Sequence, residues 1–344
     1  MNELNLGNLA NPDMHNEIIE VSGLSQSAPK KYLEAMLNIR IIEDRLAQAR
    51  KEKLIGGPVH LGAGQEAVAV GISSHLTKKD RVFGAHRSHP HILALNLDPH
   101  KLFAEILGKD TGFSKGMGGS MHLWDQKNGF YGSVPIVAGT VPLAVGAGLA
   151  AKMQDTTDIA VTYFGDGAIE EGVIHESLNL AKVHNIPVLF VSENNLFASH
   201  MHISERQPSD ATARFAQANG IPYKLIDGNN IIKVQNTAEE LISHMRLGNG
   251  PMFIEALTFR WYGHVDWRDD IDVGVNRSEE DIRKWRKRDP IKRLKEGMIK
   301  AGYWSENEHM ELISKIDKRI EECWNMAMKD PYPNDAALLD RVYY

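Results

Sequence analysis

Several features are scarce or missing in this sequence. It has a single cysteine, Cys323, which excludes a disulfide within the chain and a metal cage built from cysteines. No apolar run approaches the roughly 20 residues that a membrane-spanning helix needs. Basic residues are outnumbered by acidic ones, and a net charge of −6 argues against nucleic acid or an anionic membrane as a partner. These absences favour a water-soluble protein that acts on small molecules.

The start of the chain also lacks positive charge. Its first 29 residues contain no Lys or Arg but carry Glu3, Asp13, Glu17 and Glu20. A secretory signal begins with a basic stretch, and a transit peptide is rich in Arg. Neither pattern is present, and together with the single cysteine this predicts a protein of the reducing cytoplasm.

The composition is 42% hydrophobic and 24% charged over 344 residues, which allows one large domain or two small ones. Residues 1–28 are rich in Asn, Ser and Gly without a sustained apolar period, and this predicts an extended or loose arm. Residues 29–344 are expected to form one domain. From about residue 278 the chain is highly charged, and we predict a mostly helical C-terminal part.

The order of patterns along the domain predicts an α/β fold. A long helical period over residues 29–54 is followed, at 108–140, by a glycine-rich stretch that is too long for a plain connection. From residue 159 onward, strand patterns alternate with helical ones, which is typical of a mostly parallel sheet with helices on both faces. The other expected helices are 65–76, 99–107, 142–153, 168–184, 211–219 and 238–247, and the expected strands are 81–85, 159–164, 187–192, 223–226 and 252–260.

The strongest local signal is the run GDG at 165–167, between a predicted strand and a predicted helix. The next strand ends in ENN at 193–195, so both polar runs are expected at the carboxyl ends of neighbouring strands, where open α/β sheets bind ligands. Gly167 permits close approach of the backbone, and a helix N-terminus offers N–H groups to an anion. Asp166 and Asn195 supply the hard oxygens that Mg²⁺ prefers. This predicts a magnesium diphosphate site, with a plain strand-end turn and polar loop as the alternative.

Further motifs stand in order around this one. They are HLGAGQEA (60–67), HRSH (86–89), KGMGGSMH (115–122), PIVAGTVPLAVGAGLA (135–150), GDGAIEEGVIHESLNLAKVHNIPVLFVSENN (165–195) and YGH (262–264). Together they resemble the α subunit of the thiamine-diphosphate-dependent decarboxylating component of 2-oxo-acid and acetoin dehydrogenases, over about residues 30–344. The resemblance implies a thiamine-diphosphate-binding fold with a pyrophosphate-type domain, and an acyl-transferring oxidoreductase.

Residue by residue, the resemblance implies a site for thiamine diphosphate and Mg²⁺. Asp166 and Asn195 match the family's metal ligands, with the main-chain carbonyl of Phe197 as a third. Gly167 and Ala168 match positions whose backbone amides hold the diphosphate. Arg87 matches a diphosphate-binding arginine, and Pro135 and Val137 match backbone contacts to the aminopyrimidine ring. The other matches to cofactor-binding positions are His86 and His264.

Two of the 15 histidines, His60 and His264, match active-site histidines near the reacting carbon of the cofactor. In that role they act as general acid–base groups and help to receive the lipoyl group. Most histidines in a chain of this kind are surface or packing residues, and that alternative is as strong as a functional role for His86, His89 and His122. For Arg87 the alternative is a surface salt bridge.

The resemblance also implies partners. In the family, the glutamate that activates the aminopyrimidine belongs to a separate β subunit, and we assign it to no residue of this chain. The expected assembly is an α₂β₂ heterotetramer. The substrate is a 2-oxo acid, which loses carbon dioxide, or acetoin, which is cleaved. The acyl unit then passes to a lipoyl-bearing acyltransferase.

Several positions depart from the family's usual pattern. His86-Arg87 stands where pyruvate and branched-chain enzymes usually have Tyr-Arg, and it looks more like the acetoin branch. Pro90 replaces a common Gly, and Ser133-Val134-Pro135 replaces a stretch like Gly-Asn-Gly. After His264, the run VDW at 265–267 replaces a serine-containing start, which argues against regulatory phosphorylation there. The departures surround the cofactor, so the sequence leaves the substrate open.

Two other functions stay open on the sequence alone. One is half of a split transketolase-like carboligase, and the other is a non-catalytic nucleotide-binding subunit that uses GDG as a turn. The acidic segment HVDWRDDIDVGVN at 264–276 is expected to be mobile in the empty site and ordered by the cofactor. Trp267 then packs when the segment closes, or is a lone surface tryptophan.

Overall fold

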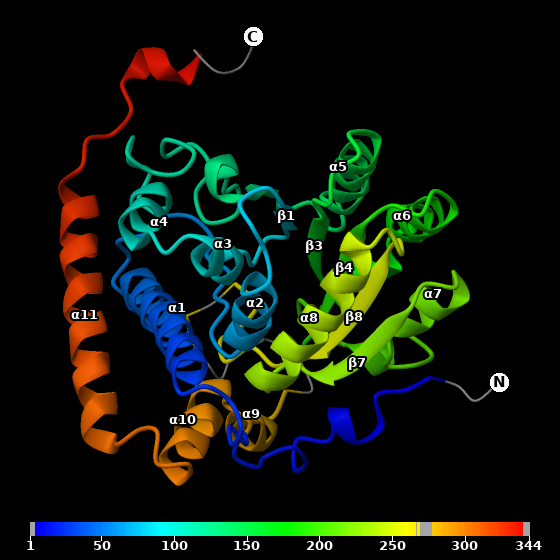
Figure 1. Ribbon diagram of the computed structural model, residues 1–344. Helices are drawn as coiled ribbons and strands as arrows, with labels where there is room; N and C mark the ends of the chain where they lie inside the picture. The colour runs from blue at the N-terminus through cyan, green and yellow to red at the C-terminus, as the bar shows by residue number, and fades with distance from the viewer. Residues whose placement is uncertain (1–3, 266, 269–276, 340–344) are drawn as a thin grey trace.

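The centre of the fold is a six-stranded sheet in which every pairing is parallel (Figure 1). The computed structural model describes residues 4–265, 267–268 and 277–339. The strand order is β2-β1-β3-β4-β8-β7, which requires crossover connections between neighbouring strands. The strands are β1 (Arg81–Gly84), β2 (Phe130–Ser133), β3 (Ala160–Gly165), β4 (Val188–Asn194), β7 (Tyr223–Asp227) and β8 (Met252–Leu257).

Helices supply the crossovers and cover the sheet. The α/β fold predicted from alternating patterns is confirmed, and the long first helix ends within three residues of its predicted bound. The helices are α1 (Ser27–Lys51), α2 (Glu66–Ser73), α3 (His89–Leu95), α4 (Pro99–Ile106), α5 (Val141–Met153), α6 (Gly172–Val183), α7 (Ala213–Ala218), α8 (Ile231–Arg246), α9 (Glu279–Arg286), α10 (Pro290–Lys300) and α11 (Glu306–Lys329).

Two apolar cores lie on the two faces of the sheet. Successive residues of a strand point to opposite faces, so Val161 and Tyr163 join one core whereas Ala160 and Phe164 join the other. The first core is completed by α1, α2 and α8, and the second by α5, α6 and α7. Because both faces of β3 and β4 are covered, these strands read as continuous buried runs.

The C-terminal part is helical, and α11 runs along α1 at one side of the molecule (Figure 1). Arg45 of α1 lies over the ring of Trp324, 4.1 Å from its centroid, and forms an ion pair with Glu321 at 2.6 Å. Each of the last three α-helices begins at a side-chain cap, from Ser278, Asp289 or Ser305.

The N-terminal arm lies along the domain. In residues 4–26 the structure has one short 3-10 helix, η1 (Gly7–Ala10), and otherwise turns, bends and irregular chain. Ile19 and Val21 are buried, and the Ile19 amide donates to the Arg293 carbonyl at 3.1 Å. A Cβ at Gly297 would lie 1.9 Å from the Ile19 carbonyl oxygen, so α10 has a glycine where the arm crosses it. The division into arm and domain stays a prediction.

Four short elements escaped the sequence patterns. The stretch 108–140, expected to be a loop, contains β2, which pairs with β1 at the sheet edge. Its four residues carry no alternation of polar and apolar side chains, so only the pairing defines it. The seven-residue α3 and the two-residue strands β5 (Phe197–Ala198) and β6 (Met201–His202) were likewise not predicted. No helix among the described residues is long and apolar enough to cross a membrane.

Candidate functional site

A cavity of about 300 Å³ opens at the carboxyl ends of β3 and β4. Its lining comes from segments far apart in the sequence, because the carboxyl ends of parallel strands meet at one edge of the sheet. All the residues predicted for the site line this cavity except Asp166, which lies buried beside it. Those lining it are His60, His86, Arg87, Pro135, Val137, Gly167, Ala168, Asn195, Phe197 and His264.

Asp166 is only 1% exposed and is held from several sides. One carboxylate oxygen, Oδ1, accepts from the backbone amide of Asn195 at 3.4 Å, and the other forms an ion pair with Arg206. The side-chain amide of Gln207 donates to the Asp166 carbonyl at 3.2 Å. Burial raises the pKa of the Asp166 carboxyl, and the Arg206 guanidinium opposes that rise. A buried carboxylate here requires a cation beside it, and Arg206 supplies one.

Gly167 is required for packing and not for backbone conformation. Its φ is −73°, which any residue adopts, but an added Cβ would lie 2.5 Å from the Cβ of Ala198. The prediction that an α-helix follows at once from residue 168 was wrong. A 3-10 turn, η3 (Ala168–Glu170), comes first, and α6 begins at Gly172. The turn places Glu170 against Arg206 and Gln207, which explains why the chain does not enter the helix directly.

Asn195 follows β4 and starts a tight turn into the β5–β6 hairpin. Its side-chain oxygen accepts from the Phe197 amide at 3.2 Å, and Leu196 between them has a φ of +70°. The Asn195 side-chain amide lies 3.5 Å from the side-chain oxygen of Gln65. Asp166 and Asn195, which the sequence placed at neighbouring strand ends, are therefore in contact.

Arg87 is buried, so its alternative interpretation as a surface salt-bridge partner is wrong. One nitrogen of its guanidinium donates to the Leu61 carbonyl at 2.6 Å, and another donates to the His264 carbonyl at 3.1 Å. The arginine thereby joins two segments that both carry predicted site histidines. A fixed, planar guanidinium at a cavity wall is suited to binding an anion.

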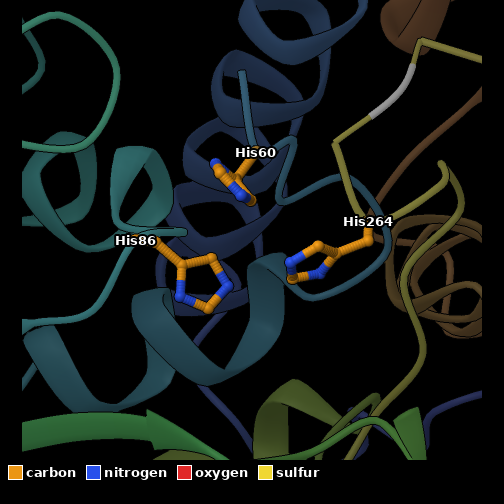
Figure 2. A group of neighbouring side chains, drawn as sticks. All are labelled: His60, His86 and His264. Atoms are coloured by element: carbon orange, nitrogen blue, oxygen red, sulfur yellow. The ribbon is translucent and has the colours of Figure 1, made fainter. Parts of the chain in front are cut away.

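His60, His86 and His264 form a cluster at one side of the cavity (Figure 2). Their ring centroids lie 4.7 to 5.3 Å apart. Burial, reinforced by the nearby Arg87 guanidinium, lowers the pKa of His60 to about 2 and that of His86 to about 3. Both imidazoles are therefore neutral at physiological pH.

The other histidines and the pyrimidine-contact residues differ in their surroundings. His89 is fully buried between Glu43 and Ser120, at 3.2 and 2.9 Å, which supports its packing alternative. His122 is exposed. Val137 lines the cavity but is 49% exposed, so it marks the cavity's mouth.

The sequence analysis missed polar residues that also line or support the cavity. His91 Nε2 lies 3.2 Å from a carboxylate oxygen of Glu193, and the His91 ring stacks on Tyr163 with centroids 3.9 Å apart. Glu193 is the first residue of the ENN run at 193–195 and was a detectable signal, since it stands at the end of β4, two positions before Asn195. Nothing local in the sequence indicated Arg206, which reaches Asp166 only through the fold.

Comparison with known proteins now identifies the class to which this fold and site belong. The profile of the family described as dehydrogenase E1 component matches residues 34–336, most of the chain. The chain therefore belongs to this family of thiamine-diphosphate-dependent oxidoreductases, and the resemblance predicted from its motifs is confirmed.

Individual relatives match nearly end to end. The chain is 37% identical over 329 residues to the α subunit of acetoin:2,6-dichlorophenolindophenol oxidoreductase from Bacillus subtilis, covering 95% of this chain and 97% of the relative. It is 32% identical to the α subunit of the pyruvate dehydrogenase E1 component from Rhizobium meliloti, over 92% of this chain and 90% of the relative. It is 34% identical to the α subunit of the pyruvate dehydrogenase E1 component from Zymomonas mobilis, over 91% of this chain and 87% of the relative.

Proposed function

We propose that this chain is the cofactor-binding α subunit of a thiamine-diphosphate-dependent acetoin or 2-oxo-acid dehydrogenase. The observation that carries the proposal is one cavity that gathers predicted residues from five separate motifs. Family membership supports the same cofactor, because relatives that match over nearly the whole chain are α subunits of such dehydrogenases. A cytoplasmic location remains a prediction from the sequence.

The residues at the end of β3 fit a magnesium diphosphate. Asp166 and Asn195 offer a carboxylate and an amide oxygen, which with the Phe197 carbonyl make the hard donor set that Mg²⁺ prefers. Arg206 already places a positive charge at the Asp166 carboxylate, which indicates that a cation is stable there. The amides of Gly167 and Ala168 and the Arg87 guanidinium are the groups that would hold the diphosphate, with Pro135 and Val137 at the ring.

When bound, thiamine diphosphate supplies a carbanion that adds to a carbonyl carbon and accepts the charge left by bond cleavage. We assign to His60 and His264 the movement of protons at the reacting groups. His60 is neutral at physiological pH, so in this state it accepts a proton before it donates one. A bound diphosphate would offset the charge of Arg87 and raise the pKa of His60 and His86 toward the useful range.

A β subunit completes the site in this proposal. It would provide the activating glutamate, in an α₂β₂ assembly that passes the acyl unit to a lipoyl-bearing acyltransferase. The described surface offers a place for it at the cavity's mouth, where Ile136 and Val137 are 71% and 49% exposed, and on α5, where Leu143 is 57% exposed. Exposed apolar side chains beside a cavity are typical of an interface.

We favour acetoin over a 2-oxo acid as the substrate, because His86-Arg87 follows the acetoin pattern and the acetoin-linked relative matches at 37% identity. The test is coexpression with the partner subunit, followed by dye reduction with acetoin and with a series of 2-oxo acids. Reduction with acetoin, and none by the purified α chain alone, is the expected result. Turnover only with a 2-oxo acid would overturn the substrate, and carbon–carbon joining without dye reduction would favour the split carboligase.

A further inference from the structure

The histidine cluster of His60, His86 and His264 has the composition of a metal site that differs from the magnesium site. The three side chains come from the segment before α2, the segment after β1 and the segment beyond β8, and they point toward one another (Figure 2). One ring nitrogen of each lies within 4.8 Å of those of the other two. His60 is 6% exposed, and its Nδ1 atom is buried without a hydrogen-bond partner. A buried imidazole nitrogen without a protein partner is available to a bound ion or water.

The size of the cluster fits a transition-metal ion. Three points within 4.8 Å of one another lie inside a circle of radius about 2.8 Å, and a Zn–N bond is about 2.0–2.1 Å long. Each nitrogen must therefore move inward by less than about 1 Å, which rotation of the side chains provides. Three imidazoles with an open fourth position are a known ligand set for Zn²⁺, whereas Mg²⁺ prefers oxygen.

We propose that His60, His86 and His264 bind Zn²⁺ or a similar borderline dication, and that the bound ion blocks the cofactor cavity. The first half of this proposal is independent of the proposed function. The second half rests on it, because it makes the site an inhibitory one for thiamine diphosphate.

The positive charge of Arg87 limits the affinity of the histidine cluster for a dication. Its guanidinium lies 3.4 Å from His264 Nδ1, so its charge opposes a dication in the cluster. An anionic fourth ligand, such as hydroxide or chloride, would offset that repulsion. We therefore expect moderate affinity, of a kind that responds to free metal and to chelators, and not a permanent structural ion.

The decisive experiment titrates the full chain, stripped with a chelator, with Co²⁺, whose visible absorption is intense only in a tetrahedral site. We expect such absorption to saturate near one ion per chain and to be removed by Zn²⁺. The variant His86→Asn should weaken binding roughly tenfold or more, because it deletes one ligand. His184→Asn is the matched control, since His184 is an exposed residue at the end of α6. Absent tetrahedral absorption, or equal effects of the two substitutions, would overturn the site.

A second variant separates this site from the magnesium site, because Co²⁺ also replaces Mg²⁺ at oxygen ligands. Asp166→Asn should leave the tetrahedral absorption unchanged, and its loss in that variant would place the ion at Asp166 and overturn the proposal.

The blocking of the cofactor cavity by the bound ion is measured by calorimetry with thiamine diphosphate and Mg²⁺. One equivalent of Zn²⁺ should raise the apparent Kd of thiamine diphosphate at least tenfold for the wild type but not for His86→Asn. Unchanged affinity overturns the inhibitory role, whereas failure of every substrate to turn over counts against the proposed function alone.

Discussion

The two sides of the cavity handle charge in different ways. Beside β3, the buried carboxylate of Asp166 faces the guanidinium of Arg206, so opposite charges are matched inside the chain. On the other side, neutral imidazoles surround Arg87, and nitrogen atoms predominate. In the proposed function, the first side holds a cation through oxygen atoms. In the proposals above, the second binds an anion at Arg87 and moves protons, and its imidazole nitrogens also offer ligand atoms to a borderline dication.

The largest effect is expected from removing the carboxylate charge of Asp166, on the side of the cavity beside β3. Asp166→Ala deletes the only carboxylate in the predicted magnesium ligand set, so Mg²⁺-dependent binding of thiamine diphosphate should fall at least roughly 100-fold. Calorimetry on the assembly with the β subunit measures it. Asp110→Asn, at an exposed position, is the control. Near-normal affinity in Asp166→Ala would show that the metal ligands lie elsewhere.

The next effect tests whether Arg206 stands in for a metal ion. Removing its charge in Arg206→Met leaves the buried Asp166 carboxylate without a cation beside it, and stability without metal should fall by roughly 3 kcal/mol. Chemical unfolding with and without Mg²⁺ measures this. Mg²⁺ should stabilise the variant more than the wild type, because the ion then takes the place of the guanidinium. Equal stabilisation of both proteins would mean that Arg206 and the ion do not share the carboxylate.

On the nitrogen side, the expected loss is in rate. His60→Ala and His264→Ala should fold normally and lower kcat roughly 10²-fold, the usual contribution of a proton-transferring side chain. Turnover of the assembly with the native acyl acceptor is the measurement, and circular dichroism checks the fold. His184→Ala, at an exposed histidine at the end of α6, is the matched control. Wild-type kcat in both variants would exclude these roles.

A smaller effect distinguishes a packed glycine from an open one. Gly167→Ala places a Cβ 2.5 Å from the Cβ of Ala198 and should destabilise the chain by about 1–3 kcal/mol. A Cβ at Gly146, within α5, meets nothing within 4 Å, so Gly146→Ala should stabilise by up to about 1 kcal/mol. Opposite signs in urea unfolding of the α chain are the expected result. Two substitutions of the same sign would contradict the close approach at Gly167.

The smallest effect is on the dependence of stability on pH. The pKa of His60 is lowered to about 2 and that of His86 to about 3, against 6.5 for an ordinary histidine. Below pH 6.5 the unfolded chain therefore binds more protons than the folded one, and stability falls as the pH falls. Each histidine contributes at most about 1.4 kcal/mol per pH unit. Between pH 6.5 and 5, His60→Asn should lose less stability than the wild type; identical slopes would mean that folding does not lower the pKa of His60.

One prediction lies largely outside the described structure. The segment 264–276 was expected to be ordered by the cofactor, and residues 266 and 269–276 are not among those described. Within it, Trp267 is partly buried against the first core, with the Lys51 amine 5.4 Å from its ring centroid. That position differs from a lone surface tryptophan. The coupling to the cofactor stays a prediction.

Much of the site could be read from local sequence. Asp166 and Asn195 follow strands whose continuous apolar runs are unmistakable, and parallel pairing brings successive strand ends to one edge. The same logic determined the α/β fold and the helical end of the chain. These features depend on short-range patterns, which the sequence carries by itself.

What only the tertiary structure decided depends on contacts between distant segments. Arg206 reaches Asp166 from 40 positions away, and Glu193 meets His91 from another strand end. The edge strand β2 exists because β1 offers it backbone partners, and its own residues carry no strand pattern. Burial lowers the pKa of His60 and keeps its imidazole neutral. The sequence alone does not show what surrounds the ring, so it could not predict this protonation state. Residue types and their spacing in the sequence predicted which side chains gather at this site. Their charges and partners depend on the folded chain, which excludes water and brings distant segments together.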